Sequence, residues 1–235
     1  MDHAAGECLV DKEVILTFGD GPVPCYTNPM LDILAAQCAK GTFFLVGEMA
    51  HTHPAAARRI YAEGRTNGKH SEDHPLRFGK LPIEKIRWEI GEGTIEVGAA
   101  LGDPREFAPF FRIRGWPDRT VVEKELAARS LVVFGSDTVA DDWHHRITLS
   151  KIIELAMKRL EARGKGILLL HHIHPRDGGC STGPPEGVKG EELPGCAGRA
   201  CCTGAILRRS AEQSPFLLAV GDRLKYSCSG RYHSD

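Results

Sequence analysis

The stretch VILTFGDGP, residues 14–22, indicates the fold more strongly than any other part of the sequence. Its first five residues are apolar or β-branched, which is typical of a strand buried inside an α/β protein. A carboxylate, Asp20, and a Gly-Pro turn follow this strand directly. In a βα barrel the carboxyl ends of the strands form the catalytic face, so we expect Asp20 to lie there. Asp-Gly is also an ordinary turn sequence, and alone this signal is weak.

From residue 14 to about residue 176, short β-rich runs alternate with longer helical stretches, a pattern that predicts a parallel sheet built from βα units. The predicted strands cover residues 14–18, 41–46, 66–70, 108–113, 131–136 and 166–173. The predicted helices lie near residues 28–37, 54–63, 82–101, 120–128 and 150–163. The last helix has the clearest apolar stripe, with Ser150 as its expected N-cap and Gly164 beyond its end. We therefore expect an α/β fold.

Two histidines, His70 and His74, follow the predicted strand at residues 66–70. At this spacing, one helical turn or a tight loop would bring both rings to one side. Imidazole binds zinc at about 2.0–2.1 Å, and two histidines plus one carboxylate leave positions open for water and substrate, as hydrolytic sites require. Two solvated loop histidines are an equally common interpretation of such a short motif.

Histidines also end the apolar strand predicted at residues 166–173, where His171, His172 and His174 crowd together. An imidazole at the carboxyl end of a strand can protonate a leaving amine, because its ordinary pKa of about 6.5 suits proton transfer at neutral pH. A structural histidine at the strand end is the alternative interpretation.

In chain order, these elements resemble the polysaccharide deacetylase family, also called the NodB-homology domain or carbohydrate esterase family 4. Residues 17–22, TFGDGP, are similar to its TFDDGP motif, residues 70–74 to its H(S/T)xxH motif, and residues 169–171 to its LxH motif. Two weaker similarities are residues 111–116, to the arginine motif, and residues 137–143, to the Asp-Trp motif. The resemblance extends to about residue 176.

The resemblance implies a distorted, incomplete (β/α) barrel that hydrolyses an acetyl group from a glycan. It makes Asp20, His70 and His74 the ligands of one divalent metal ion, zinc or alternatively cobalt. It also implies two substrate-binding residues, with Trp143 walling the groove and Leu169 lining the pocket for the acetyl methyl group. The expected partner is therefore an acetylated poly- or oligosaccharide.

The resemblance further implies which residues transfer protons. His171 would be the general acid, and either Asp137 or Asp142 would tune it. Arg112 would orient the catalytic base. These roles are chemically sensible, because a base takes the proton of the attacking water and an acid releases the sugar amine.

The sequence departs from the family pattern where the catalytic base is expected. Gly19 replaces the first aspartate of the TFDDGP motif and cannot accept a proton. Removing a general base typically costs about 10²- to 10⁴-fold in rate, so we expect weakened hydrolysis with the metal retained. The alternative is a catalytically silent, metal-containing carbohydrate-binding protein. Arg114 stands where the family usually has proline, which changes the expected shape of the substrate groove. His172 stands where the family often has aspartate, which changes the support expected for His171.

Composition restricts the partners and the compartment. With 30 Lys and Arg against 31 Asp and Glu, the chain has no global field that would attract nucleic acid. We expect no membrane span, because no segment approaches the roughly 20 apolar residues that one requires. The first residues also lack the pattern of a signal peptide. A cytoplasmic protein is the default expectation, and an exported one if the gene model has lost a leader. No feature indicates an oligomeric state.

The chain divides at about residue 176. Residues 11–176 are predicted to form the deacetylase (NodB-homology) domain. Residues 177–235 are rich in Gly, Pro and Cys and have no sustained helical or strand periodicity. We expect this tail to be poorly ordered, and a frameshift in the coding sequence would produce such an abrupt change. A short apolar run at residues 216–220 could form a strand.

Overall fold

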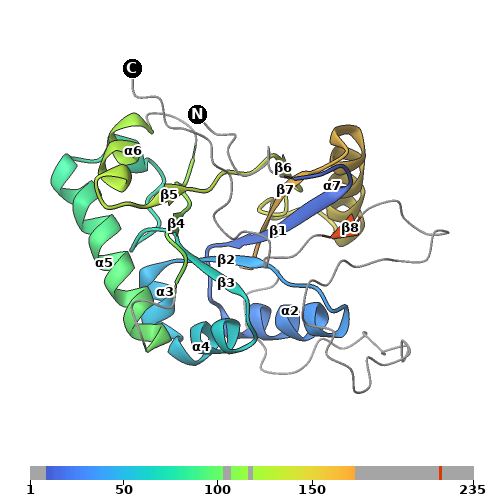
Figure 1. Cartoon of the computed structure of the whole chain (residues 1–235), viewed down its shortest axis with the longest axis horizontal. Helices are drawn as coiled ribbons and strands as arrows, with labels where there is room; N and C mark the ends of the chain where they lie inside the picture. Colours follow the sequence, from blue (N-terminus) through green and yellow to red (C-terminus); the bar gives the residue numbers. More distant parts are fainter. Residues whose placement is uncertain (1–8, 103–106, 116–118, 173–216, 219–235) are drawn as a thin grey trace.

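The computed structural model describes residues 9–102, 107–115, 119–172 and 217–218. Its centre is one parallel sheet with helices on its outer surface (Figure 1). Most of residues 177–235, for which the sequence predicts poor order, lie outside the described residues. Among the described residues, no helix is both long enough and apolar enough to cross a membrane.

The strands follow one another in the sheet in the order β5-β4-β3-β2-β1-β7-β6, and every pairing is parallel. Their bounds are β1 (Glu13–Gly19), β2 (Thr42–Leu45), β3 (Thr66–Lys69), β4 (Phe110–Phe111), β5 (Val132–Val133), β6 (Thr138–Val139) and β7 (Gly166–His171). A further short strand, β8 (Leu217–Leu218), pairs with the start of β1. Within the described part of the chain, β5 and β6 end the sheet without pairing with each other. The fold is therefore an incomplete barrel, as the sequence predicts.

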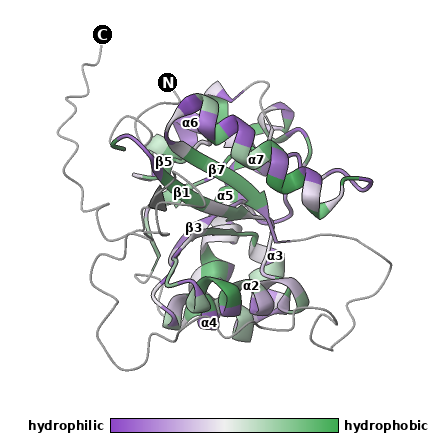
Figure 2. Cartoon of the chain, turned by 90° about the vertical axis from the view of Figure 1, so that its right-hand side faces the viewer, coloured by the Kyte–Doolittle hydropathy of each residue, from purple (hydrophilic) through white to green (hydrophobic). Residues whose placement is uncertain are grey.

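Helices pack on the outer face of the curved sheet. Their bounds are α2 (Pro24–Ala36), α3 (Gly47–Thr52), α4 (Pro54–Ala62), α5 (Ile83–Leu101), α6 (Thr120–Ala127) and α7 (Leu149–Arg163), with a 3₁₀ turn η1 (Phe78–Lys80) before α5. Figure 2 shows the hydrophobic strand β7 with α7 on one side and α2 and α4 on the other.

The apolar core has an outer part and an inner part. Outside the sheet, buried residues such as Phe43, Ile60 and Val97 pack the helices against the strands. Inside the half-barrel, Phe44 and Phe134 belong to a smaller cluster with Ile15 and Ile167. Removing this apolar surface from water stabilises the fold. The carboxyl ends of β1, β3 and β7 carry polar side chains, as is usual for the catalytic face of a βα barrel.

The sequence predicts five of the helices and six of the strands, and the structure differs in three details. Helix α3 was not predicted, because six residues are too short to show helical periodicity. Strand β6 was not predicted either. The N-cap of α7 is Thr148, whose side chain accepts from the backbone N–H of Lys151 at 3.2 Å, and not the expected Ser150. The predicted Gly164 does end α7, with φ of 79°.

Candidate metal and active site

Asp20 and His70 leave the sheet at the same edge, because β1 and β3 are parallel and separated only by β2. Asp20 directly follows β1 and has a left-handed backbone, with φ of 76°. In the loop after β3, Ser71 and His74 also take positive φ values, 66° and 54°. Such values are uncommon for residues with a side chain and concentrate at functional sites.

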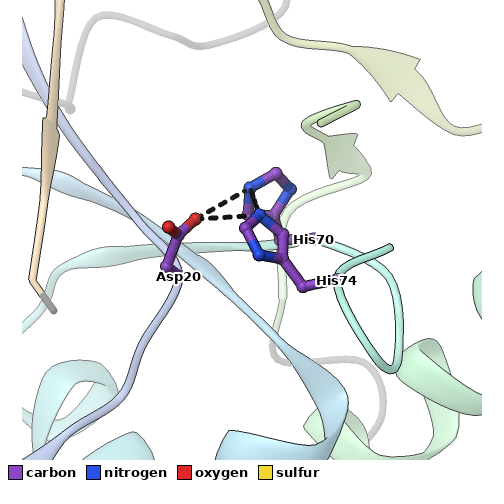
Figure 3. A group of neighbouring side chains, drawn as sticks. All are labelled: Asp20, His70 and His74. Atoms are coloured by element: carbon purple, nitrogen blue, oxygen red, sulfur yellow. Dashed lines mark hydrogen bonds and ion pairs between the residues drawn. The ribbon is translucent and has the colours of Figure 1, made fainter. Parts of the chain in front are cut away.

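Figure 3 shows how the three predicted ligands meet. Oδ1 of Asp20 lies 3.2 Å from Nε2 of His70 and 3.0 Å from Nε2 of His74. The two Nε2 atoms lie 3.0 Å apart. Two atoms bound to one zinc ion at tetrahedral angles are about 3.3 Å apart, which is close to these spacings. Within the described residues, this is the one group of histidines and carboxylates that could hold a metal ion.

The hydrogen bonds of His70 fix which ring atom faces Asp20. Nδ1 of His70 lies 2.6 Å from the backbone oxygen of Arg112. A carbonyl oxygen only accepts, so Nδ1 carries the hydrogen and Nε2 of the neutral ring presents a lone pair. Burial lowers the pKa of His70 to about 4, so the ring is neutral at pH 7.

The same site keeps Asp20 charged. Burial alone would raise the pKa of Asp20, but hydrogen bonds from the imidazoles of His70 and His74, in the forms that carry a hydrogen on Nε2, lower it well below its usual value. With the hydrogen of His70 on Nδ1 instead, a carboxylate oxygen and an imidazole lone pair face each other 3.2 Å apart. Both are acceptors, and a shared cation would stabilise this arrangement.

The loop that carries both histidines is fixed from α5. Glu89 is fully buried, and its Oε2 accepts from the backbone N–H of Glu72 at 3.1 Å and of Asp73 at 2.9 Å. Gly93 lets this helix approach closely, since a Cβ there would lie 2.5 Å from the backbone carbon of Ser71. The loop conformation is therefore set by backbone contacts and does not depend on the ligand side chains alone.

His171, at the end of β7, is held by Asp142. Its Nδ1 lies 2.9 Å from Oδ1 of Asp142, and its backbone N–H donates to Oδ2 at 2.6 Å. The register pairs His171 with Gly19 at the end of β1. The imidazole therefore stands beside the strand that positions Asp20, where a fixed ring can transfer a proton.

Asp137 lies elsewhere. Its carboxylate accepts from the backbone N–H of Ile167 at 2.9 Å and from Arg163 at 2.8 Å, near the opposite end of β7. Of the two carboxylates predicted to tune His171, the structure brings only Asp142 to it.

A family model described as polysaccharide deacetylase matches residues 6–125, about half of the chain. The chain belongs to the polysaccharide deacetylase family. A chitooligosaccharide deacetylase of Sinorhizobium fredii is 42% identical over 70% of this chain and 74% of its own length. One of Rhizobium leguminosarum bv. trifolii is 31% identical over 71% of this chain and 74% of its own length.

A solved structure gives the same result. The peptidoglycan deacetylase of Bdellovibrio bacteriovorus has 29% identity and a TM-score of 0.64 over 71% of this chain. The matched region spans 46% of that protein, so the relative is much longer than this domain. The sequence comparisons and the structural comparison therefore indicate the same family.

Gly19 distinguishes this polysaccharide deacetylase from the TFDDGP pattern. It is buried at the end of β1 and has no positive φ. A Cβ built there would lie 3.5 Å from Cδ2 of His171 and 3.8 Å from Nε2 of His70, which are ordinary contact distances. Position 19 therefore lies between the candidate metal group and the candidate acid, and it has room for a Cβ.

Arg112 is buried beside Thr17, two residues before this position on β1, and is incompletely paired among the described residues. Its Nη2 donates to Oγ1 of Thr17 at 2.8 Å, and the guanidinium lies 4.1 Å from the centre of the Phe44 ring. Thr17 and Gly19 face the same side of β1, because side chains alternate along a strand. Nη1 is buried and has no hydrogen-bond partner among the described residues. Burial lowers the pKa of Arg112 to about 9, so it is still charged at pH 7.

The two predicted substrate-binding residues border His171. The Trp143 ring meets the His171 ring edge-to-face at 5.7 Å and is 49% exposed, so it can contact a ligand. Leu169 precedes His171 by two residues on β7, which places it on the same face of the strand. It pairs with Thr17 in the register.

Three supporting roles were not predicted from the sequence, although it marks Arg114 and His172 as departures from the family pattern. Glu89 lies on the same buried stripe of α5 as Ile86 and Ile90, and a carboxylate among apolar residues was a usable signal. Arg114 donates to the backbone oxygen of His74, so it fixes the histidine loop. His172 contacts the turn after Asp20, which no sequence pattern reveals.

Proposed function

We propose that this domain is a metal-dependent deacetylase of N-acetylated poly- or oligosaccharides whose hydrolysis is slowed by Gly19. The observation that carries the proposal is the group of Asp20, His70 and His74, with acceptor atoms 3.0–3.2 Å apart, at the same strand ends as His171. Zinc is the proposed ion and cobalt the alternative, because two imidazoles and one carboxylate suit both. The catalytic domain would comprise residues 11–176, and residues 177–235 would be a tail, of which the short strand β8 joins the sheet of the domain.

The roles of the side chains follow from their contacts. A bound divalent ion would polarise the acetyl carbonyl and lower the pKa of water. His171, held at Nδ1 by Asp142, would give a proton from Nε2 to the leaving sugar amine. Trp143 would wall the groove, and Leu169 would contact the acetyl methyl group. Gly19 has no group to take the proton of the water, and we propose that Arg112 belongs to the same incomplete base position.

The substrate class comes from the relatives. Two of them are named chitooligosaccharide deacetylases, and others are named peptidoglycan-N-acetylglucosamine deacetylases. N-acetylglucosamine stands in the second group of names, and it is also the sugar unit from which chitooligosaccharides are built. We therefore propose a glycan that contains N-acetylglucosamine as the substrate.

A second candidate function is a silent, metal-containing protein that binds such glycans without hydrolysing them. Gly19 favours it, since it has no base, and so does Nη1 of Arg112, which has no hydrogen-bond partner among the described residues. The two functions share the same metal group and differ only in turnover.

Acetate release tests the proposal. We would supply N-acetylglucosamine oligomers and peptidoglycan fragments with zinc or cobalt to the unaltered chain and to Gly19→Asp. We expect Gly19→Asp to release acetate about 10²- to 10⁴-fold faster, because it restores a base at a position with room for its Cβ.

Two controls separate the outcomes. Gly19→Asn has nearly the shape of the Asp variant but cannot take a proton, so it should stay slow. His70→Ala in the Gly19→Asp background should abolish release by removing a ligand. If Gly19→Asp is inactive on both substrates while it binds metal, the deacetylase proposal is wrong. If the unaltered chain shows no turnover but binds the oligomers, the silent function is favoured.

A further inference from the structure

His172 makes two hydrogen bonds to the turn that carries Asp20 and a third to the helix that follows the turn. Its backbone N–H donates to the carbonyl oxygen of Gly19 at 3.2 Å. Its ring Nε2 accepts from the backbone N–H of Gly21 at 2.7 Å, and its Nδ1 lies 3.1 Å from Oγ1 of Thr27 on α2. The residues before and after Asp20 are thus both bonded to His172, Gly19 through the backbone N–H and Gly21 through the ring. His172 is 1% exposed, so water does not compete for these bonds.

The partners determine the hydrogen positions of the ring. A backbone amide can only donate, so Nε2 of His172 is the acceptor, and in the neutral ring Nδ1 carries the hydrogen toward Thr27. Both ring nitrogens are therefore used by protein atoms. His172 has no free nitrogen to offer a metal ion, and any effect on the site must act through the backbone.

Steric contact reinforces the hydrogen bonds. A Cβ on Gly21 would lie only 2.1 Å from Cε1 of His172, so the imidazole occupies the space where any other residue would place its side chain. The Phe43 ring holds the imidazole from another direction, with ring centres 5.5 Å apart. The imidazole and the Gly21 backbone fit each other closely, and neither can shift without the other.

We propose that His172 is a positioning residue that holds Asp20 in its left-handed conformation and thereby sets the affinity of the metal site. The inference rests on the proposed metal group of Asp20, His70 and His74. With φ of 76°, Asp20 has a conformation that costs energy unless its surroundings impose it. The bonds to the flanking residues supply that constraint and aim the carboxylate at the two imidazoles.

Cobalt binding to purified, metal-free protein tests the role without any substrate. We would compare the unaltered chain with His172→Phe, which fills the ring volume but has no acceptor, and with His172→Gln, which keeps an acceptor. Loss of a group that orients a ligand typically lowers metal affinity about 10- to 100-fold, and we expect this for His172→Phe. His172→Gln should regain most of the affinity, which a role in packing alone would not explain.

The outcomes distinguish this inference from the proposed function. If the unaltered chain binds no cobalt, the metal site itself is wrong. If it binds cobalt in a His70-dependent way and His172→Phe binds equally well, only the positioning role is overturned. Circular dichroism and the melting temperature of each metal-free variant would show that the variants are folded.

A second measurement needs no variant. Nitrogen-15 NMR of the unaltered chain should show Nε2 of His172 without a hydrogen and Nδ1 with one, both before and after zinc is added. The Gly21 amide should exchange slowly with solvent. A hydrogen on Nε2, or a rapidly exchanging Gly21 amide, would overturn the proposal even if His172→Phe failed to fold.

Discussion

The two halves of the site differ in completeness. In the metal half, Asp20, His70 and His74 are supported by a carbonyl oxygen, by the loop amides bound to Glu89, and by the turn against His172. In the proton-transfer half, His171 has its carboxylate partner, but Gly19 has no side chain, and Nη1 of Arg112 has no partner within the part of the chain that the structure describes. The metal half is held mainly by backbone contacts, so it can persist when position 19 changes.

Substitution of Asp142 should have the largest effect, on the rate of acetate release, and would test the comparison of the two halves most strongly. In the Gly19→Asp background, Asp142→Asn should slow acetate release about 10²-fold or more, because the amide keeps the shape but cannot pair as a carboxylate with His171. The pH–rate profile should change as well, which loss of packing alone would not cause.

Asp137→Asn is the matched control. Asp137 bonds Ile167 and Arg163 and not His171, so its substitution should reduce stability while leaving the rate within about threefold. If Asp137→Asn and Asp142→Asn slowed acetate release equally, the two halves of the site would not be organised as described.

The next effect is on stability in acid. Burial lowers the pKa of His172 to about 3 in the folded chain, against about 6.5 when it is unfolded. Protons then bind the unfolded chain first, so stability present above about pH 6.5 is lost as the pH falls toward 3, by about 2 kcal/mol at pH 5. Denaturant unfolding of metal-free protein at pH 7 and pH 5 measures this loss of unfolding free energy. His172→Gln should lose about 2 kcal/mol less over this interval; an identical loss would contradict the assignment.

The smallest effect concerns Arg112. With metal bound, Gly19→Asp would give Nη1 of Arg112 a carboxylate partner, so the two positions should be coupled. A double-mutant cycle of Gly19→Asp and Arg112→Met should give a coupling free energy of about 1.5 kcal/mol in unfolding experiments. Gly19→Asn serves as the uncharged comparison in the same cycle. A coupling near zero would separate Arg112 from position 19 and weaken the account of an incomplete base position.

Much of the fold could be predicted because it depends on local patterns. The continuous apolar run before Gly19 is typical of a buried strand, and the stripe of α7 shows its helical period directly in the sequence. The short elements could not be predicted in this way, since α3 and β6 are too brief for periodicity and depend on tertiary packing.

The candidate site was predictable only as far as motifs extend. Asp20, His70, His74 and His171 stand at recognisable spacings, and the structure brings all four to one edge of the sheet. The choice between Asp137 and Asp142 could not be made from sequence, because both precede β7 by similar distances along the chain. It depends on which carboxylate reaches His171 in space.

The contacts of His172 were not predictable for a related reason. The bond between Gly21 and His172 joins residues 151 positions apart, and its acceptor atom meets a backbone amide that no sequence motif marks. Long-range contacts of side chains with the backbone are visible only once the strands are placed side by side.

The most direct test of the central claim is a cobalt titration of the metal-free unaltered chain beside Gly19→Asp, followed by visible absorbance. The account predicts one ion per chain for both proteins, with affinities within about threefold of each other, because position 19 supports proton transfer and not the metal half. Stoichiometric binding by Gly19→Asp together with none by the unaltered chain would contradict it, since the metal half would then depend on the missing carboxylate.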